Sequence, residues 1–167
     1  MKTLLALFLS LGLAASALAA GKPVATPYAP ARVLFDFYFD NPQKIGSALF
    51  WVRSLVNTLQ GSPYDYAAED NKIVVVIHGT EIVTVARHNE ARYQEAVDRM
   101  RYYADLGVSF RVCGQAMADF GYRIEDMQGF VEVVPNAITE LAHWQQQGYA
   151  LIIPQIQDKR FDIDAIR

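Results

Sequence analysis

An unbroken apolar run in the middle of the chain, KIVVVIHG at residues 72–79, constrains the fold more than any other segment. Its five consecutive apolar residues, Ile73 to Ile77, leave no polar position for a side that faces water. A strand with one solvated face alternates apolar and polar residues, whereas a parallel strand covered on both faces does not. The run therefore predicts a strand of a parallel sheet that helices cover on both sides.

The residues before this run have the pattern of a strand followed by an amphipathic helix. RVLFDFYFD begins a strand at about residues 32–39, rich in aromatic and β-branched residues. Asn41 and Pro42 are a helix-start signal, with Asn41 as the cap and Pro42 in the first helical position. Gly61 and Pro63 end the helix. Its apolar face consists of Ile45, Leu49, Val52, Leu55, Val56 and Leu59.

The second half of the chain repeats this alternation. A helix is predicted from Asn89 until Gly107, and the strand VSFRV follows at about residues 108–112, closed by Cys113. Short helical material broken by glycines leads to a fourth strand, FVEVV, at residues 130–134.

A further helix and strand complete the pattern. Pro135 and Asn136 open a helix through Gln147, which Gly148 terminates, and YALII is the fifth strand. The predicted inward face of this helix consists of Ile138, Leu141 and Ala142.

Strands that alternate with helices predict one α/β domain: a three-layer α/β/α fold with a mostly parallel five-stranded sheet. Reactive groups in such sheets gather outside the carboxyl ends of the strands. Three predicted strand ends carry suitable side chains, namely Asp40-Asn41, His78-Gly79 and Cys113-Gly114.

The ends of the chain have compositions of their own. Residues 1–19 have a lysine, an apolar run and a small-residue site at Ala17-Leu18-Ala19, as in a secretory signal peptide. We therefore expect a periplasmic or secreted protein with no membrane insertion after cleavage. Residues 20–31 are predicted to be an irregular leader, 32–154 the domain, and 155–167 a C-terminal tail. The formal net charge of −3 argues against nucleic acid as a partner.

Cys113 is the single cysteine, so it cannot form an internal disulfide. In an exported protein a lone thiol is buried, paired with another chain, or used chemically. A thiol at a helix start has main-chain N–H groups directed at it, which stabilises the thiolate, and Gly114 would leave room for a substrate or partner. The alternative is a buried cysteine that acts as a small hydrophobe.

Two residues near Cys113 are candidates for supporting roles. His78 would be a general base or binding group in the same crevice, or would simply hydrogen-bond a neighbouring loop. Arg111 lies two positions before Cys113 on the same predicted strand, so both side chains point the same way. It would stabilise a thiolate or persulfide, or would form a structural salt bridge.

Other chemistries lack their residues. One cysteine and three dispersed histidines make a poor zinc site, no GxSxG motif marks a hydrolase serine, and no glycine-rich turn forms a phosphate cradle. We expect neither a metal nor an organic cofactor.

Several motifs resemble the DsrE/DsrF-like family: VCGQAM after the third strand, VEVVPNAITEL after the fourth, WQQQGYALIIP at the fifth, and the HG of His78-Gly79. The resemblance spans roughly residues 32–154. It implies a three-layer fold with a five-stranded parallel sheet and a trimeric or hexameric assembly. Some members carry sulfane sulfur as a persulfide on one cysteine, and the family's cysteine after the third strand corresponds to Cys113. Export would be a departure from the cytoplasmic sulfur-relay proteins.

The sequence thus predicts an exported sulfur carrier or sulfurtransferase that acts through Cys113, with His78 and Arg111 in support and protein thiols as donor or acceptor. The alternative is a non-catalytic oligomeric module that binds a ligand or a protein and has an inert cysteine. Apolar residues of the tail are expected to pack on a neighbouring copy; they are Ile156, Phe161, Ile163 and Ile166.

Overall fold

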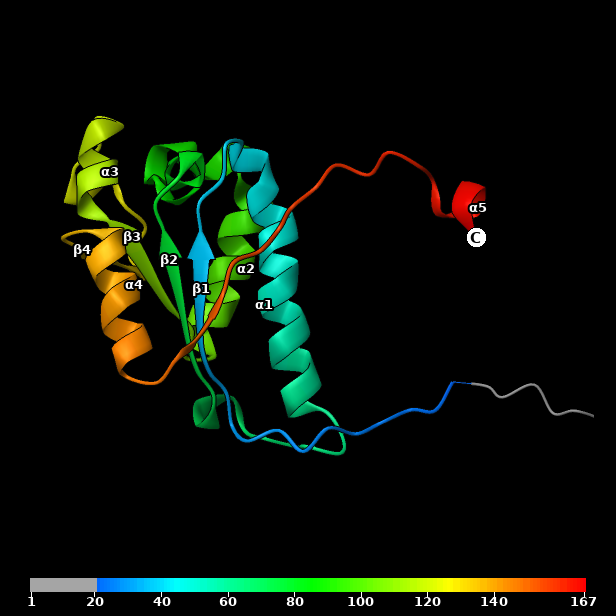
Figure 1. Cartoon of the computed structure of the whole chain (residues 1–167). Helices are drawn as coiled ribbons and strands as arrows, with labels where there is room; N and C mark the ends of the chain where they lie inside the picture. Colours follow the sequence, from blue (N-terminus) through cyan, green and yellow to red (C-terminus); the bar gives the residue numbers. More distant parts are fainter. Residues whose placement is uncertain (1–20) are drawn as a thin grey trace, which may run out of the picture.

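The computed structural model describes residues 21–167. The predicted signal peptide, residues 1–19, lies outside the described residues. Within these residues five strands alternate with five α-helices. Figure 1 shows their arrangement. The strands are β1 (Arg32–Phe37), β2 (Lys72–Ile77), β3 (Ser109–Cys113), β4 (Val131–Val134) and β5 (Ala150–Ile152). The helices are α1 (Ile45–Gln60), α2 (Gln94–Asp105), α3 (Gly114–Asp119), α4 (Ala137–Gln146) and α5 (Ile163–Ile166).

The sheet is entirely parallel, with the strand order β4-β3-β2-β1-β5. The chain adds β2, β3 and β4 on one side of β1 and then returns to place β5 on the other side. Crossovers between parallel strands are right-handed, so reversing the direction of travel moves the connecting helix to the opposite face. Consequently α1 and α2 pack on one face and α4 on the other, which confirms the predicted three-layer α/β/α fold.

The two faces bury different amounts of apolar surface. The larger cluster lies between the sheet and helices α1 and α2, and includes Phe35, Phe37, Leu49 and Met100. The smaller lies under α4 and consists of Leu34, Val74, Val76, Cys113, Ala137 and Leu141. The buried β2 run contributes to both, with odd-numbered residues in the larger cluster and even-numbered residues in the smaller one.

The helix boundaries follow local signals that the sequence carries. Asn41 Oδ1 accepts the N–H of Gln43 at 2.9 Å and caps the short 3₁₀ turn that leads into α1, as predicted. Asn136 Oδ1 accepts the N–H of Ile138 at 2.8 Å at the start of α4. Gly148 has a φ of 82° just after α4, a conformation that glycine adopts without strain.

The predicted inward face of α4 was wrong in part. Ile138 is 64% exposed and Ala142 is also exposed, whereas Ala137 and Leu141 are buried. Because α4 covers its face of the sheet alone, only a narrow stripe of the helix contacts strands. A broader apolar stripe would be buried only if a neighbouring helix lay beside it.

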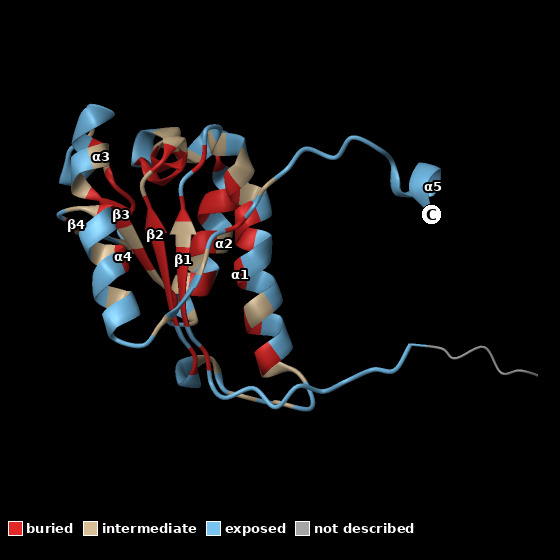
Figure 2. Ribbon diagram, viewed as in Figure 1, coloured by how far each residue is buried: buried red, intermediate tan, exposed pale blue. Residues whose placement is uncertain are grey.

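The segments outside the sheet differ in exposure (Figure 2). The leader residues 21–30 are exposed, and Tyr64 and Tyr66 each donate a hydrogen bond to its main chain. The tail leaves the domain after β5 and ends in α5 (Figure 1). Three of its apolar side chains are at least 64% exposed, namely Phe161, Ile163 and Ile166. Among the described residues no helix is both long and apolar enough to cross a bilayer.

Candidate functional site

Cys113 is the last residue of β3 and lies on the sheet face that α4 covers. The residue is 4% exposed, and its side chain belongs to the small apolar cluster with Val76 and Leu141. Its place at the carboxyl end of a central strand is where reactive groups collect in parallel sheets. The position and the burial point in opposite directions: the first favours chemistry, the second an inert thiol.

The sulfur of Cys113 accepts two main-chain hydrogen bonds. The N–H of Ala116 lies 3.4 Å from Sγ, and the N–H of Ala137 lies 3.3 Å from it. Ala116 is in the first turn of α3, and Ala137 is the first residue of α4. Two N–H donors at helix starts stabilise negative charge on the acceptor atom, so this surrounding suits a thiolate.

Gly114 does not hold open a space for a substrate. A Cβ atom at this position would lie 2.9 Å from the carbonyl oxygen of Val134 and 3.4 Å from a methyl group of Val133. The absence of a side chain instead lets the end of β4 approach the turn after β3. Gly114 therefore brings α4 and its first N–H close to the Cys113 sulfur.

His78 follows β2 directly and is held by two contacts. Its Nε2 lies 2.7 Å from Oδ1 of Asp36 on β1, and the two side chains are only 13% and 15% exposed. Its ring stacks on Tyr38, with centroids 4.8 Å apart and an interplanar angle of 22°. The sequence analysis did not single out Asp36. A lone acidic residue within a strand usually indicates only that its side chain faces solvent.

Arg111 lies on the same face as Cys113 but is engaged by its own neighbours. Its guanidinium forms ion pairs with Glu132 and Glu140, each at 2.9 Å, and lies over the ring of Trp144 at 5.0 Å. Trp144 Nε1 also donates to Glu140 at 2.7 Å. The predicted alternative of a structural salt bridge is thus present, and it ties β3 and β4 to α4.

Glu81 is a buried carboxylate that the sequence did not single out. It is 0% exposed and accepts the main-chain N–H groups of Phe39 at 3.0 Å, Gly79 at 2.8 Å and His78 at 3.2 Å. Burial raises the pKa of Glu81 above its ordinary value, although these hydrogen bonds act to lower it. The carboxylate joins the loops after β1 and β2, and so fixes the main chain at His78.

The glycine beside His78 explains how Glu81 reaches this place. A Cβ on Gly79 would lie 2.5 Å from the Phe39 nitrogen and 2.6 Å from the Glu81 carboxylate. Only a glycine admits both. A glycine two positions after a buried strand, followed two residues later by an acid, was the available sequence signal.

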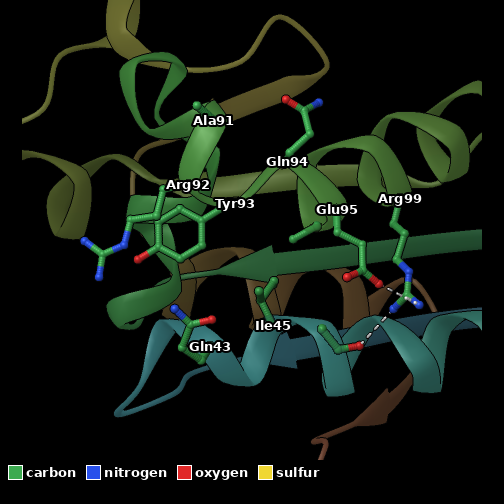
Figure 3. A pocket seen from close by; sticks show the side chains of 10 residues that line it. Gln43, Ile45, Ala91, Arg92, Tyr93, Gln94, Glu95 and Arg99 are labelled. Carbon is green, nitrogen blue, oxygen red and sulfur yellow. Dashed lines mark hydrogen bonds and ion pairs between the residues drawn. The ribbon is translucent and has the colours of Figure 1, made fainter.

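A pocket of about 320 Å³ lies on the opposite side of the sheet, between the start of α1 and the region before α2 (Figure 3). Its charged lining includes Glu95 and Arg99, which form an ion pair at 3.2 Å, and Arg92. None of Cys113, His78 and Arg111 lines it. In residues 21–167 no group of three or more histidine, cysteine or acidic side chains is arranged to hold a metal ion.

Comparisons with known proteins support the three-layer α/β/α fold. A sequence profile of the DsrE/DsrF-like family matches residues 32–154. The chain belongs to the DsrE/DsrF-like family. Its fold is similar to a solved protein of unknown function from Methanobacterium thermoautotrophicum, with a TM-score of 0.60 and 23% identity over 74% of this chain and 99% of that one. No curated protein matches the chain.

Proposed function

We propose that this DsrE/DsrF-like protein is an exported sulfur carrier or sulfurtransferase that accepts sulfane sulfur on Cys113. The observation that carries the proposal is the pair of main-chain N–H groups at 3.4 and 3.3 Å from the Cys113 sulfur, at the carboxyl edge of the sheet. These donors stabilise the Cys113 thiolate, both as the nucleophile that accepts sulfur and as the group released when sulfur is passed on. The ion pairs of Arg111 with Glu132 and Glu140 neutralise its charge, so Arg111 would support the site by holding β3, β4 and α4 together.

The reaction with thiosulfate balances without a cofactor. The Cys113 thiolate attacks the outer sulfur of thiosulfate, a new S–S bond forms, the S–S bond of thiosulfate breaks, and sulfite leaves with the electron pair. A partner thiolate then attacks the outer sulfur of the Cys113 persulfide, and the Cys113 thiolate is released.

The proposal extends to compartment and assembly. The pattern of residues 1–19 supports export to the periplasm or beyond, which N-terminal sequencing of the secreted or periplasmic fraction tests. Exposed apolar side chains on α1 and on the tail support a homo-oligomer, which by the family resemblance would be a trimer or hexamer, and sedimentation analysis that finds only monomer would contradict this. These side chains are Phe50, Trp51, Phe161, Ile163 and Ile166.

A second candidate function rests on the burial of Cys113. At 4% exposure the sulfur is shielded by α4, as expected for a non-catalytic module that binds a ligand or a protein elsewhere. The two candidates differ in one measurable property, which is the reaction of the native thiol with a small reagent.

The first experiment measures sulfur loading. The chain that begins at residue 20 is incubated with thiosulfate or polysulfide, and its intact mass is recorded beside that of Cys113→Ser. The expected result is a gain of one sulfur atom on the wild type alone, removed by a reductant. An unchanged mass, together with a thiol that reacts only after denaturation, would sink the carrier proposal and support the binding module.

A further inference from the structure

Two contacts fix the orientation of the His78 imidazole. The hydrogen bond with Asp36 at 2.7 Å holds Nε2, and the stacked ring of Tyr38 holds one face of the imidazole. Tyr38 itself is 69% exposed, so the stack lies at the surface while Asp36 lies beneath it. In catalytic triads a carboxylate likewise orients the histidine that takes the proton of the nucleophile.

The register places His78 beside Cys113, with Asp36 one strand further away on β1. Ile77 pairs with Val112 across β2 and β3, so the next residues, His78 and Cys113, are neighbours on adjacent strands. The even-numbered positions of β2, Val74 and Val76, share the apolar cluster of Cys113, which puts His78 on the same face. Adjacent strands lie about 4.8 Å apart, so the side chains of His78 and Cys113 leave the main chain at neighbouring positions.

The Asp36–His78 pair also lies next to the point where the strand order of the sheet reverses. The strand order reverses at β1, which stands between β2 and β5. Crevices outside the carboxyl ends of strands at such a reversal are the usual ligand sites of open α/β sheets. Asp36 and Tyr38 come from the end of β1, so the pair borders this point.

The hydrogen bond to Asp36 assigns the tautomer of His78. An ionised carboxylate accepts hydrogen bonds and donates none, so Nε2 carries the hydrogen of the pair. In a neutral imidazole the other nitrogen, Nδ1, then has a free lone pair. His78 is therefore presented as a proton acceptor, with its orientation set by Asp36.

We propose that His78 takes the proton of the Cys113 thiol and that Asp36 is the positioning residue that holds His78 for this step. The inference rests on the proposed function for the identity of the nucleophile. The proton passes from Sγ to Nδ1, which leaves a thiolate and an imidazolium whose charge Asp36 balances. The thiolate then attacks the electrophile, and the leaving group takes the electron pair of the bond that breaks.

Few other charged groups bear on this step. On the face shared with His78, Arg111 is already paired with Glu132 and Glu140, so its net effect at the site is reduced. Glu81 touches His78 only through the main-chain N–H at 3.2 Å. In the described part of the chain the imidazole is hydrogen-bonded to the side chain of Asp36.

Alkylation with iodoacetamide tests the proposal, because Cys113 is the only cysteine and each labelled molecule reports on it. Rates are measured as a function of pH for the wild type, His78→Gln, Asp36→Asn and the double variant. Asp40→Asn is the matched control, because its carboxylate follows the same strand but pairs with Lys44 at 2.7 Å. Tyr38→Leu provides an exposed-site variant if Asp36→Asn does not fold.

We expect Asp36→Asn and His78→Gln each to slow alkylation at neutral pH by about tenfold or more. The two variants should share one pH profile that differs from that of the wild type, and the double variant should be no slower than either, because the residues act as a unit. Tyr38→Leu should lose part of the rate, and Asp40→Asn none.

Two outcomes separate this inference from the proposed function. If Cys113 takes up sulfur but Asp36→Asn and His78→Gln react like the wild type, the carrier stands and the positioning role of Asp36 is overturned. If alkylation depends on Asp36 as expected but no sulfur is taken up, the pair stands and the carrier fails. A native thiol that iodoacetamide never reaches overturns both.

Discussion

The two faces of the sheet differ in how they are covered and in what they carry (Figure 2). Helices α1 and α2 cover one face, and the large cluster beneath them includes Phe35, Phe37 and Phe110. Helix α4 alone covers the other face, where the buried cluster is small and includes Cys113. The same small face holds the Asp36–His78 pair and the Arg111 ion pairs. We infer that stability resides mainly on one face and candidate chemistry on the other.

The difference has a physical origin in the strand order. Because the crossovers are right-handed, only the connection from β4 back to β5 places a helix on the second face. One helix cannot cover five strands, so polar side chains are tolerated at the edge of its contact. Partly exposed carboxylates and imidazoles keep contact with water there and avoid the cost of full burial.

The largest expected effect comes from truncating the same residue type on each face. Leu49→Ala on α1, at 0% exposure, should lower the free energy of unfolding by about 4 kcal/mol. Leu141→Ala on α4, at 8% exposure, should lower it by about 2 kcal/mol. Both changes remove the same atoms, so the difference reports how tightly each face is packed. Urea unfolding measures both, and equal losses would remove the distinction between the faces.

The next effect concerns the carboxylate that joins the loops after β1 and β2. Glu81→Gln replaces one acceptor oxygen by an NH₂ group, which cannot accept the main-chain N–H bonds of that oxygen. Leaving a buried donor without its acceptor should cost about 1–3 kcal/mol of unfolding free energy. Urea unfolding near pH 5 measures the loss, and a variant as stable as the wild type would refute this role for Glu81.

The difference in unfolding free energy between the wild type and Glu81→Gln should depend on pH. Because burial raises the folded pKa of Glu81, the unfolded chain ionises first as the pH rises. The contribution of Glu81 to stability is therefore fully present below the ordinary glutamate pKa and declines as the pH rises through the raised value. The stability difference between wild type and Glu81→Gln should shrink over this window, and a difference that grows with pH would contradict the assigned direction.

The smallest effect tests the close approach of β4 to Cys113. Gly114→Ala should cost about 1–2 kcal/mol, because its Cβ would lie 2.9 Å from a main-chain oxygen. Gly129→Ala is the control, since no atom lies within 4 Å of its added Cβ, and its stability should stay within about 0.5 kcal/mol of the wild type. Thermal unfolding of both variants gives the comparison. If Gly114→Ala is as stable as its control, β4 can move away from residue 114 at little cost in free energy, and the close approach is not required.

The candidate site could be predicted in part. Strand-end position alone pointed to His78 and Cys113, because parallel strands finish at one edge. Asp36 was not predicted, because its contact with His78 joins residues 42 positions apart and depends on which strand lies beside β2. The N–H of Ala137 at the Cys113 sulfur was also missed, because it comes from α4, 24 positions away.

The sequence by itself determined the alternation of strands and helices, the parallel sheet, the caps at Asn41 and Asn136, and the placement of one cysteine at a strand end. These follow from local periodicity and from residues that act on their own main chain. The strand order, the sparse cover of one face, the Asp36–His78 pair and the approach of β4 at Gly114 were decided only by the tertiary structure. Each joins segments distant in the chain, and a contact of that kind is set by register and crossover handedness, which no local pattern encodes.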